Sequence, residues 1–427
     1  MKIIIVGSGP GGLSAAWAAR SFNRDADVII ITKETTEAHK KPGSAMALEY
    51  PETETLNIPE WSNESLEKMG IEVRSGVRVM DADVSSKILE VETSGSEIDS
   101  ISYDKLIIAT GGTAYVPEIP GTDLEGVFTI QDVSDSARIG TRMKRYQDIV
   151  VVGAGFSGLE IAEKLLELDK KAHLIVRSRL MRRLLEKRMS DELESRLPRS
   201  LEVHKGKSPS AVLGDERVKG LAINGTELET DAVIFMTGVN PKVDLAKKLG
   251  LKIGSLGGIV VDSKMRTSEE DVFAVGDCIE MADFYTVKPV MMPIGSVAAR
   301  CGRQAGVIAV GGQKVYEDTD LRFQYDRIFN TDIVCVGHSS EIASRVGVEV
   351  DVHFLTHPAE QMEIAVVTSK DGQVLGGQVI SSRLGAKMGY QILLRMQDDA
   401  TLEENPLLDP LHDRILTSMK HRYGPIG

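Results

Sequence analysis

The chain contains the pattern Gly-x-Gly-x-x-Gly twice, and each copy stands between a short apolar run and a helix-like segment. The first copy spans residues 7–12, after the apolar run 3–6, and the second spans residues 153–158, after the run 149–152. In this setting the glycines let the backbone approach a pyrophosphate at a helix N-terminus. One copy alone is weak evidence, but two copies predict that two dinucleotides bind to one protein. That is the arrangement of a flavoenzyme that a nicotinamide reduces.

Length, charge and cysteine content narrow the class of protein. A chain of 427 residues is too long for one compact core, so we expect two or three domains. The net charge of −13 argues against nucleic-acid binding, and no apolar run is long enough to span a bilayer. No signal-peptide pattern precedes the first strand, and the three cysteines give no disulfide framework. We therefore predict a cytoplasmic protein, and we expect no metal cofactor.

The order of elements along the chain predicts an α/β protein with two similar halves followed by a smaller domain. Each half closes on an apolar strand that ends in Thr-Gly, at residues 110–111 and 237–238, so the halves look like an internal duplication. The last hundred or so residues alternate as strands before a helix at 387–397, which predicts an α+β domain. The expected βαβ elements are strand 2–6, helix 13–22 and strand 28–31, then strand 148–152, helix 158–168 and strand 172–176.

An ordered set of motifs gives the chain a family resemblance. After the two glycine patterns, the set contains Ala109-Thr110-Gly111, Thr237-Gly238 and Ala274-Val275-Gly276-Asp277. With this set, residues 1 to about 310 resemble the pyridine nucleotide-disulfide oxidoreductase superfamily, which are flavoproteins with two dinucleotide-binding domains. Length and order are most similar to the branch of NADH oxidases and coenzyme A-disulfide reductases.

The resemblance implies a fold and a set of domain boundaries. The fold would contain two Rossmann-like three-layer domains and a C-terminal α+β dimerisation domain. The implied boundaries are 1–112 with 243–318 for a discontinuous FAD-binding domain, 113–242 for an NAD(P)H-binding domain and 319–427 for the dimerisation domain.

The resemblance also implies which residues bind FAD. Gly7, Gly9 and Gly12 would hold the pyrophosphate, and Asp277 the ribityl chain, with Gly276 allowing the close approach. A helix over residues 293–303 would point its N-terminus at the flavin edge that gains negative charge on reduction. An ordinary helix N-cap is the alternative role for Asp277. The further implied FAD contacts are Pro10, Thr32, Lys33, Lys41, Pro42, Val79, Ala109, Thr110, Gly111 and Ile294.

One FAD contact departs from the usual pattern. An acidic residue usually ends the second strand, about 20 residues past the glycines, and binds the ribose hydroxyls. Thr32 stands there in this chain, and Lys33 and Glu34 follow it. Thr32 can still form a hydrogen bond with the ribose, and Glu34 is the other candidate for this role.

The second nucleotide site departs from the usual pattern at Arg177, where NADH enzymes usually carry a carboxylate. A carboxylate would accept a hydrogen bond from the ribose 2′-hydroxyl and repel a 2′-phosphate, whereas an arginine offers that phosphate two donors. Arg182 and Arg183 add positive potential, although these basic residues also fit a solvated helix face. We therefore predict NADPH rather than NADH as the reductant. The other residues expected at this site are Gly153, Gly155, Phe156, Ser157, Gly158, Ser178 and Gly238.

The loop after the second strand lacks the cysteine that disulfide reductases of this superfamily place there. Residues 38–46 contain no cysteine, and their Lys-Pro-x-Ser pattern resembles the loop of rubredoxin and ferredoxin reductases. The resemblance places Lys41 near the flavin N5, together with Glu160, although the dipole of the second helix alone could favour an acid at position 160. Ser44, the remaining catalytic candidate in the loop, cannot carry out thiol–disulfide exchange.

Outside these motifs, one histidine and the cysteines remain candidates. In the branch named above, a segment near the C-terminus reaches the flavin of the partner subunit. His412 would lie in that segment as a proton donor, and a surface histidine is the alternative. Cys278, Cys301 and Cys335 have no Cys-x-x-Cys spacing, so we interpret them as buried structural residues, with a redox thiol as the less favoured alternative.

These observations predict an FAD-dependent NAD(P)H oxidoreductase. NADPH, or less favourably NADH, would reduce FAD, and the electrons would then pass to oxygen, a quinone or a small redox protein. One alternative is a disulfide or coenzyme A-disulfide reductase with a relocated thiol, and another is a non-enzymatic flavin-binding redox sensor. We expect a homodimer formed through the C-terminal domain, no nucleic-acid partner and no membrane span.

Overall fold

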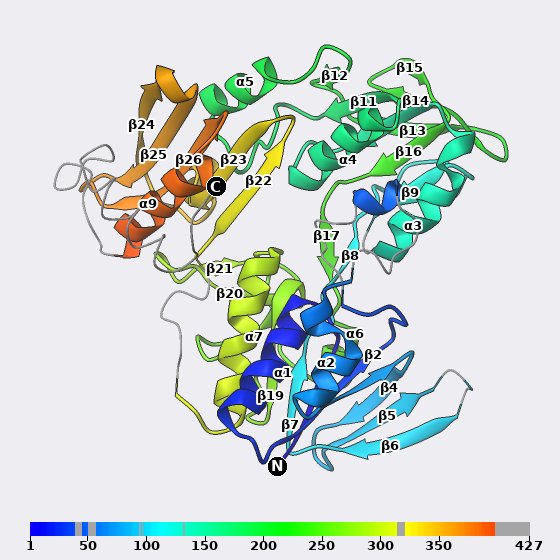
Figure 1. The fold of residues 1–427 in the computed structure, drawn as a ribbon, viewed down its shortest axis with the longest axis vertical. Helices are drawn as coiled ribbons and strands as arrows, with labels where there is room; N and C mark the ends of the chain where they lie inside the picture. Colours follow the sequence, from blue (N-terminus) through cyan, green and yellow to red (C-terminus); the bar gives the residue numbers. More distant parts are fainter. Residues whose placement is uncertain are drawn as a thin grey trace. The chain divides into compact units, whose positions relative to one another are not determined.

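The computed structural model describes residues 1–38, 45–49, 57–93, 95, 97–130, 133–313 and 321–397, and the chain falls into two compact units (Figure 1). The first unit consists of Met1–Met181 and Arg196–Arg322, and the second of Arg182–Ser195 and Phe323–Gly427. The first unit therefore contains both glycine patterns. The finer division into three domains stays a prediction.

A five-stranded parallel sheet with the order β19-β7-β1-β2-β3 forms the frame of the first half. Its central strand β1 is almost fully buried, because the sheet is covered on both faces, and this is why it reads as a continuous apolar run rather than an alternating one. The strands of this sheet are β1 (Lys2–Val6), β2 (Asp27–Thr32), β3 (Ile71–Ser75), β7 (Lys105–Ile108) and β19 (Val272–Ala274).

The second half repeats this design. Its parallel sheet has the order β12-β11-β10-β16-β9, and β10 pairs with β11 and β16 as β1 pairs with β2 and β7. Each half also has a three-stranded antiparallel sheet. The internal duplication expected from the two Thr-Gly strand ends is therefore present in the topology. The strands of the second parallel sheet are β9 (Val127–Thr129), β10 (Asp148–Val152), β11 (Lys171–Val176), β12 (Glu202–Lys205) and β16 (Ala232–Phe235).

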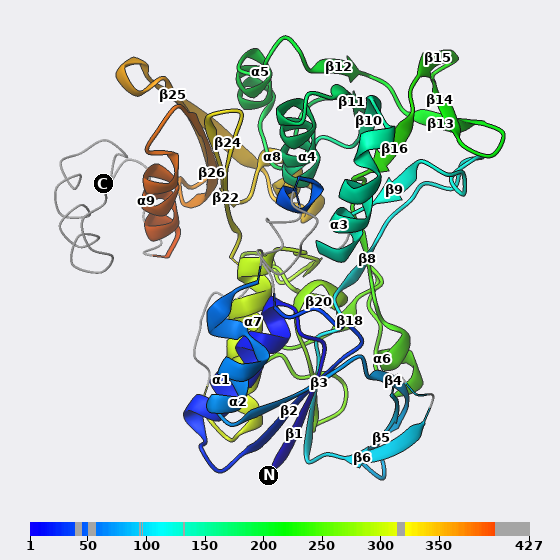
Figure 2. The same cartoon turned by 45° about the vertical axis from the view of Figure 1, so that its right-hand side comes forward.

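Two helices, α1 (Pro10–Phe22) and α7 (Gly295–Ala309), run side by side on one face of the first sheet. Figure 2 shows the antiparallel sheet β4–β6 on the other face. The two helices approach closely because glycines line their contact: a Cβ at Gly302 would lie 2.1 Å from the Gly11 carbonyl oxygen. This packing fixes the N-terminus of α7 beside the first glycine turn.

The remaining elements of the first unit connect or cover these sheets. A short antiparallel pair, β8 with β17, joins the two halves. Among the described residues, no helix has both the length and the apolar character needed to cross a membrane. The elements are α2 (Asn63–Lys68), β4 (Arg78–Asp83), β5 (Ile88–Glu92), β6 (Ile98–Ser102), β8 (Gly112–Ala114), α3 (Val133–Arg142), α4 (Phe156–Glu167), β13 (Pro209–Gly214), β14 (Val218–Ile223), β15 (Thr226–Glu229), β17 (Val239–Pro241), α6 (Asp244–Lys248), β18 (Ile259–Val260), β20 (Ile279–Ala282) and β21 (Pro289–Val290).

The second unit is built on an antiparallel sheet with the order β22-β23-β26-β25-β24, and helix α9 packs on β23 and β26. Its strands β23, β25 and β26 are almost entirely buried. The buried Glu186, next to α5, accepts hydrogen bonds from Ser340 at the start of α8. The elements are α5 (Lys187–Ser195), β22 (Phe323–Ile328), β23 (Thr331–Gly337), α8 (Ser340–Arg345), β24 (Val350–His357), β25 (Met362–Ser369), β26 (Val374–Ser381) and α9 (Gly385–Gln397).

Candidate active site

The first glycine turn joins β1 to α1, and its three glycines have different surroundings. Gly7 has a φ of +116°, and a Cβ there would lie 2.2 Å from the Ala109 carbonyl oxygen. A Cβ at Gly12 would lie 2.0 Å from the Gly7 carbonyl oxygen. A Cβ at Gly9, by contrast, would meet no described atom within 4 Å. Gly7 and Gly12 are therefore required by packing, and Gly9 borders open space where a ligand phosphate can approach.

The second glycine turn, between β10 and α4, has the same geometry. Gly153 has a φ of +117°, and a Cβ there would lie 2.3 Å from the Met236 carbonyl oxygen. A Cβ at Gly158 would lie 2.0 Å from the Gly153 carbonyl oxygen, and one at Gly155 would meet no described atom within 4 Å. The same turn therefore occurs twice in the chain, each time with open space beside its middle glycine where the same kind of ligand can approach.

Each turn leads into a helix whose N-cap residue is a glycine. A glycine has no side chain, so none caps the first N–H groups of these helices. Gly9 and Gly155 occupy the N-cap positions of α1 and α4, and the first turns of both helices contain no acidic residue. The open N–H groups and the helix dipole together favour an anion at each terminus. The two turns thus fit the pyrophosphates of two dinucleotides.

Two other segments expected at the FAD site lie next to the first turn: Val275, which precedes Gly276-Asp277, is 3.1 Å from a Cβ built at Gly11, and Pro10 is 3.9 Å from one built at Gly295, which follows Ile294. Val275 donates its backbone N–H to the Ile108 carbonyl at 2.9 Å, so the Gly276-Asp277 motif follows a strand adjacent to β7, which ends at Ile108, just before Ala109. Gly276 has a φ of +83°. Ile294 is the N-cap of α7. The FAD roles of these residues stay predictions, as does that of Val79, which is half-buried on β4.

Sequence reasoning missed the partner of Thr32. Thr32 ends β2 and is 5% exposed. Its hydroxyl oxygen accepts a hydrogen bond from the Ser8 hydroxyl at 3.0 Å and another from the Glu34 backbone N–H at 3.2 Å. Ser8 lies between the first two glycines, so a polar residue inside the turn was the sequence signal that could have predicted this hydrogen bond. Lys33 is exposed beside this pair.

Arg177 and Ser178 follow β11 directly, and both are exposed. They stand at the carboxyl end of the strand next to the second glycine turn, which is the place where the ribose of a bound nucleotide is read. Phe156 and Ser157 begin α4, and Gly238 has a φ of +119°. Arg182 belongs to the second unit, so its predicted part in the nucleotide site stays a prediction.

Helix α4 also carries the half-buried Glu160 and, one turn later, Lys164. Lys164 forms ion pairs with Glu167 and, at 3.1 Å, with Glu49. Burial opposes the charged form, but these two carboxylates outweigh it and raise the pKa of Lys164. The ion pair with Glu49, 115 residues away in sequence, links α4 to the segment just after the 38–46 loop. Nothing in the sequence pattern indicated this contact.

Four predicted site residues lie outside the described residues: Lys41, Pro42, Ser44 and His412. The cysteines can be placed. Cys278, Cys301 and Cys335 are at most 2% exposed, and none of them is in a disulfide. Burial raises the pKa of the Cys278 thiol, which disfavours the reactive thiolate.

Comparison with known proteins agrees with this geometry. The model of the family described as pyridine nucleotide-disulphide oxidoreductase matches residues 1–302. An NADH oxidase of Methanocaldococcus jannaschii is 30% identical over 397 residues, which cover 89% of this chain and 87% of that protein. A CoA-dependent NAD(P)H sulfur oxidoreductase of Pyrococcus furiosus is 30% identical over 397 residues, which cover 90% of this chain and 88% of that protein.

Two further proteins extend the comparison. The solved structure of an NAD-dependent persulfide reductase from A. fulgidus has a TM-score of 0.87 and 27% identity, covering 99% of this chain and 84% of that chain. A rubredoxin-NAD(+) reductase of Pseudomonas putida is 25% identical over 285 residues, which cover 65% of this chain and 72% of that protein. The chain is therefore an oxidoreductase enzyme and a flavoprotein of the NAD(P)H-dependent type, and it belongs to the pyridine nucleotide-disulphide oxidoreductase family.

Proposed function

We propose that the chain catalyses electron transfer from NADPH, through bound FAD, to an acceptor such as oxygen, a quinone or a small redox protein. When bound, FAD supplies the ring that accepts a hydride and releases electrons. The two glycine turns of this chain would hold the two dinucleotides, and binding both reactants on one protein would supply the proximity that electron transfer requires. The observation that carries the choice of NADPH is Arg177, exposed at the end of β11.

The preference for NADPH follows from the residue types after β11. Arg177 and Ser178 can both donate hydrogen bonds to a 2′-phosphate, and both are exposed to a ligand. Neither can act as the carboxylate that accepts from a 2′-hydroxyl and repels a phosphate.

Two observations support an acceptor that does not require a thiol of this chain. The 38–46 loop contains no cysteine, and the three cysteines that the chain does contain are buried. The similarity to a rubredoxin-NAD(+) reductase supports a small redox protein as one candidate acceptor. The similarity to an NADH oxidase supports oxygen as another.

A second candidate function is the reduction of a coenzyme A-linked or other disulfide or polysulfide. It is favoured by the similarity to the CoA-dependent NAD(P)H sulfur oxidoreductase. This function would require a thiol that the substrate itself brings, or one of the buried cysteines.

Rapid anaerobic mixing of the purified flavoprotein with NADPH, and separately with NADH, tests the proposal. We expect the flavin absorbance to bleach faster, and at lower nucleotide concentration, with NADPH. The reduced enzyme is then mixed with oxygen, a quinone, a rubredoxin and coenzyme A disulfide. Fast reoxidation by one of the first three supports the proposal, and fast reoxidation by the disulfide alone would replace it with the second candidate.

A further inference from the structure

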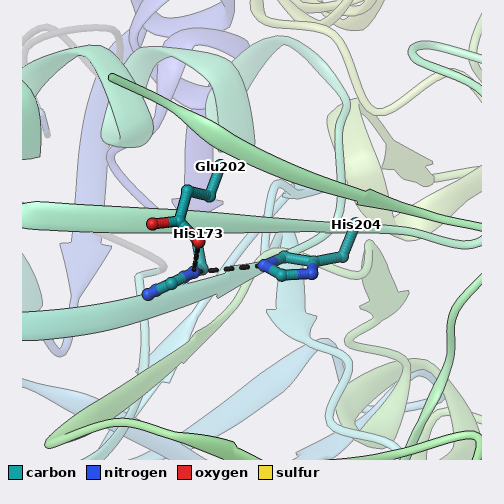
Figure 3. Close-up of side chains that lie close together, drawn as sticks. All are labelled: His173, Glu202 and His204. Carbon is teal, nitrogen blue, oxygen red and sulfur yellow. Dashed lines mark hydrogen bonds and ion pairs between the residues drawn. The ribbon is translucent and has the colours of Figure 1, made fainter. Parts of the chain in front are cut away.

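Three side chains with metal-binding atoms converge on the edge of the second parallel sheet, away from both glycine turns. They are His173 on β11 and Glu202 and His204 on β12 (Figure 3). The two strands are parallel, with His173 opposite Glu202. His173 is fully buried, His204 is partly buried, and the side chain of Glu202 is half exposed.

The spacing of the three atoms is that of metal ligands. His173 Nδ1 lies 3.1 Å from His204 Nε2 and 3.3 Å from Glu202 Oε2, as the dashed lines in Figure 3 indicate. In a tetrahedral zinc site with bonds of about 2.0–2.1 Å, two ligand atoms stand roughly 3.3 Å apart. The group therefore needs little movement to surround a cation, and the exposed side at Glu202 leaves room for a water ligand.

Hydrogen bonding alone leaves this group poorly satisfied. His173 Nε2 lies 2.8 Å from Asp148 Oδ1, and both atoms are buried without a hydrogen-bond partner among the described residues. If the ring proton is on Nε2, facing this carboxylate, Nδ1 presents a lone pair. The lone pairs of Nδ1 and Glu202 Oε2 then face each other with no proton between them. One cation could accept lone pairs from all three ligand atoms. A proton on His204 Nε2 can form a hydrogen bond with His173 Nδ1 only, which leaves Glu202 Oε2 without a donor.

Asp148 takes the place of the carboxylate that commonly orients a metal-bound histidine. A ligating histidine usually directs its second ring nitrogen to a carboxylate, which fixes the tautomer and raises the basicity of the ligand. Asp148 begins β10, the strand next to β11, so its position is fixed by the sheet itself.

We propose that His173 Nδ1, His204 Nε2 and Glu202 Oε2 form a binding site for a divalent transition-metal cation such as Zn²⁺. Two imidazole nitrogens and one carboxylate suit zinc and its neighbours better than Mg²⁺ or Ca²⁺, which prefer all-oxygen sites. The site departs from the sequence-based expectation of no metal. Its ligand on β11, His173, lies four residues before Arg177, or about 13 Å along the strand. The cation would therefore stabilise the pairing of the edge strand β12 with β11 rather than contact the nucleotide.

The charged neighbours set the conditions for binding. Lys171 lies 3.8 Å from Glu202 Oε1 and 3.0 Å from Asp148 Oδ2. It therefore uses the oxygens that do not face the site, and its charge moderates the affinity. Lys207 adds a second positive charge near His204.

Isothermal titration calorimetry of the purified, chelator-treated flavoprotein with ZnCl₂ tests the site at pH 7.5. We expect one equivalent of Zn²⁺ to bind to the unaltered protein. His204→Ala and Glu202→Gln each remove one ligand, and both should weaken binding by more than tenfold. Asp148→Asn should weaken it by about 10- to 100-fold, as the loss of an orienting carboxylate does. His353→Ala, at an exposed histidine on β24, is the matched control and should bind Zn²⁺ as the unaltered protein does.

A thermal melt without metal shows whether each variant is folded. The added Zn²⁺ should raise the melting temperature of the unaltered protein and of His353→Ala, but not that of His204→Ala. The proposal is wrong if the unaltered protein binds no Zn²⁺, or if His204→Ala and Glu202→Gln bind it as tightly as the control. Should His204→Ala fail to fold, Glu202→Gln alone decides, because its side chain is half exposed.

Discussion

Ser8 donates its hydroxyl proton to the Thr32 hydroxyl oxygen across 3.0 Å, and this bond ties the first glycine turn to the end of β2. Proteins with this glycine pattern usually carry an acidic residue at the position of Thr32. A threonine can serve there because the turn supplies its own polar partner and the Glu34 N–H supplies a second. At the position predicted to bind the adenosine end of FAD, a pair of hydroxyl groups thus stands where a carboxylate is usual.

Replacing Thr32 with valine should weaken FAD binding. The change keeps the volume of the side chain but leaves the Ser8 hydroxyl and the Glu34 N–H without their acceptor. We expect a loss of about 0.5–1.5 kcal/mol, or roughly two- to tenfold in the dissociation constant of FAD. Equilibrium dialysis of FAD against the apoprotein measures this. Thr35→Val, at an exposed threonine nearby, is the control, and equal dissociation constants for the two variants would contradict the assignment.

The cysteines should be inaccessible and dispensable for electron transfer to a non-thiol acceptor. All three are at most 2% exposed, so a thiol reagent should modify them only after unfolding. Counting the thiols titrated before and after denaturation, alongside NADPH turnover of the treated enzyme, checks this. Rapid modification of a native cysteine with loss of turnover, while NADPH still reduces the flavin, would instead favour the disulfide reductase.

The stability of the first half should depend on pH through Asp271. The hydrogen bonds from Lys105 and Lys87 lower the pKa of this carboxyl group. Because the folded-state pKa is lowered, the stabilisation is present above the unfolded-state pKa of about 3.9 and is lost as the pH falls through the folded-state pKa. Asp271→Asn should therefore cost up to about 1 kcal/mol at neutral pH, and this cost should disappear as the pH falls through the folded-state pKa.

Urea unfolding of the unaltered protein and of Asp271→Asn at neutral and acid pH measures this difference. The exposed Asp123→Asn is the matched control and should show no such pH dependence. A difference between Asp271→Asn and the unaltered protein that stays the same at both pH values would rule out the ion pairs as its cause.

The main features of the fold follow from local signals in the sequence. The apolar runs before Gly7 and Gly153 predicted the central strands, and the glycine spacing predicted the turns. Strands and turns of this kind are predictable because they depend on residues that are neighbours in the sequence. The strand β22 was not anticipated. Its residues are mostly half-buried or exposed, so the apolar pattern there is weak.

Long-range contacts explain what the sequence could not predict. His173 and His204 are 31 residues apart, and only the parallel register of β11 and β12 brings them together. The ion pair of Lys164 with Glu49 likewise depends on how two halves of the first unit pack. No spacing rule within the chain encodes such pairs, since they arise from the tertiary structure.

The most direct test of the central claim is the nucleotide preference of Arg177→Glu. Flavin reduction by NADPH and by NADH is measured under anaerobic conditions for this variant, for the unaltered protein and for Arg199→Glu, which makes the same charge change at another exposed arginine. Loss of a charge-assisted hydrogen bond of about 1.5–3 kcal/mol should lower the NADPH-to-NADH preference by roughly 10- to 100-fold in Arg177→Glu alone. An unchanged preference in Arg177→Glu, or equal reduction of the unaltered protein by both nucleotides, would contradict the account.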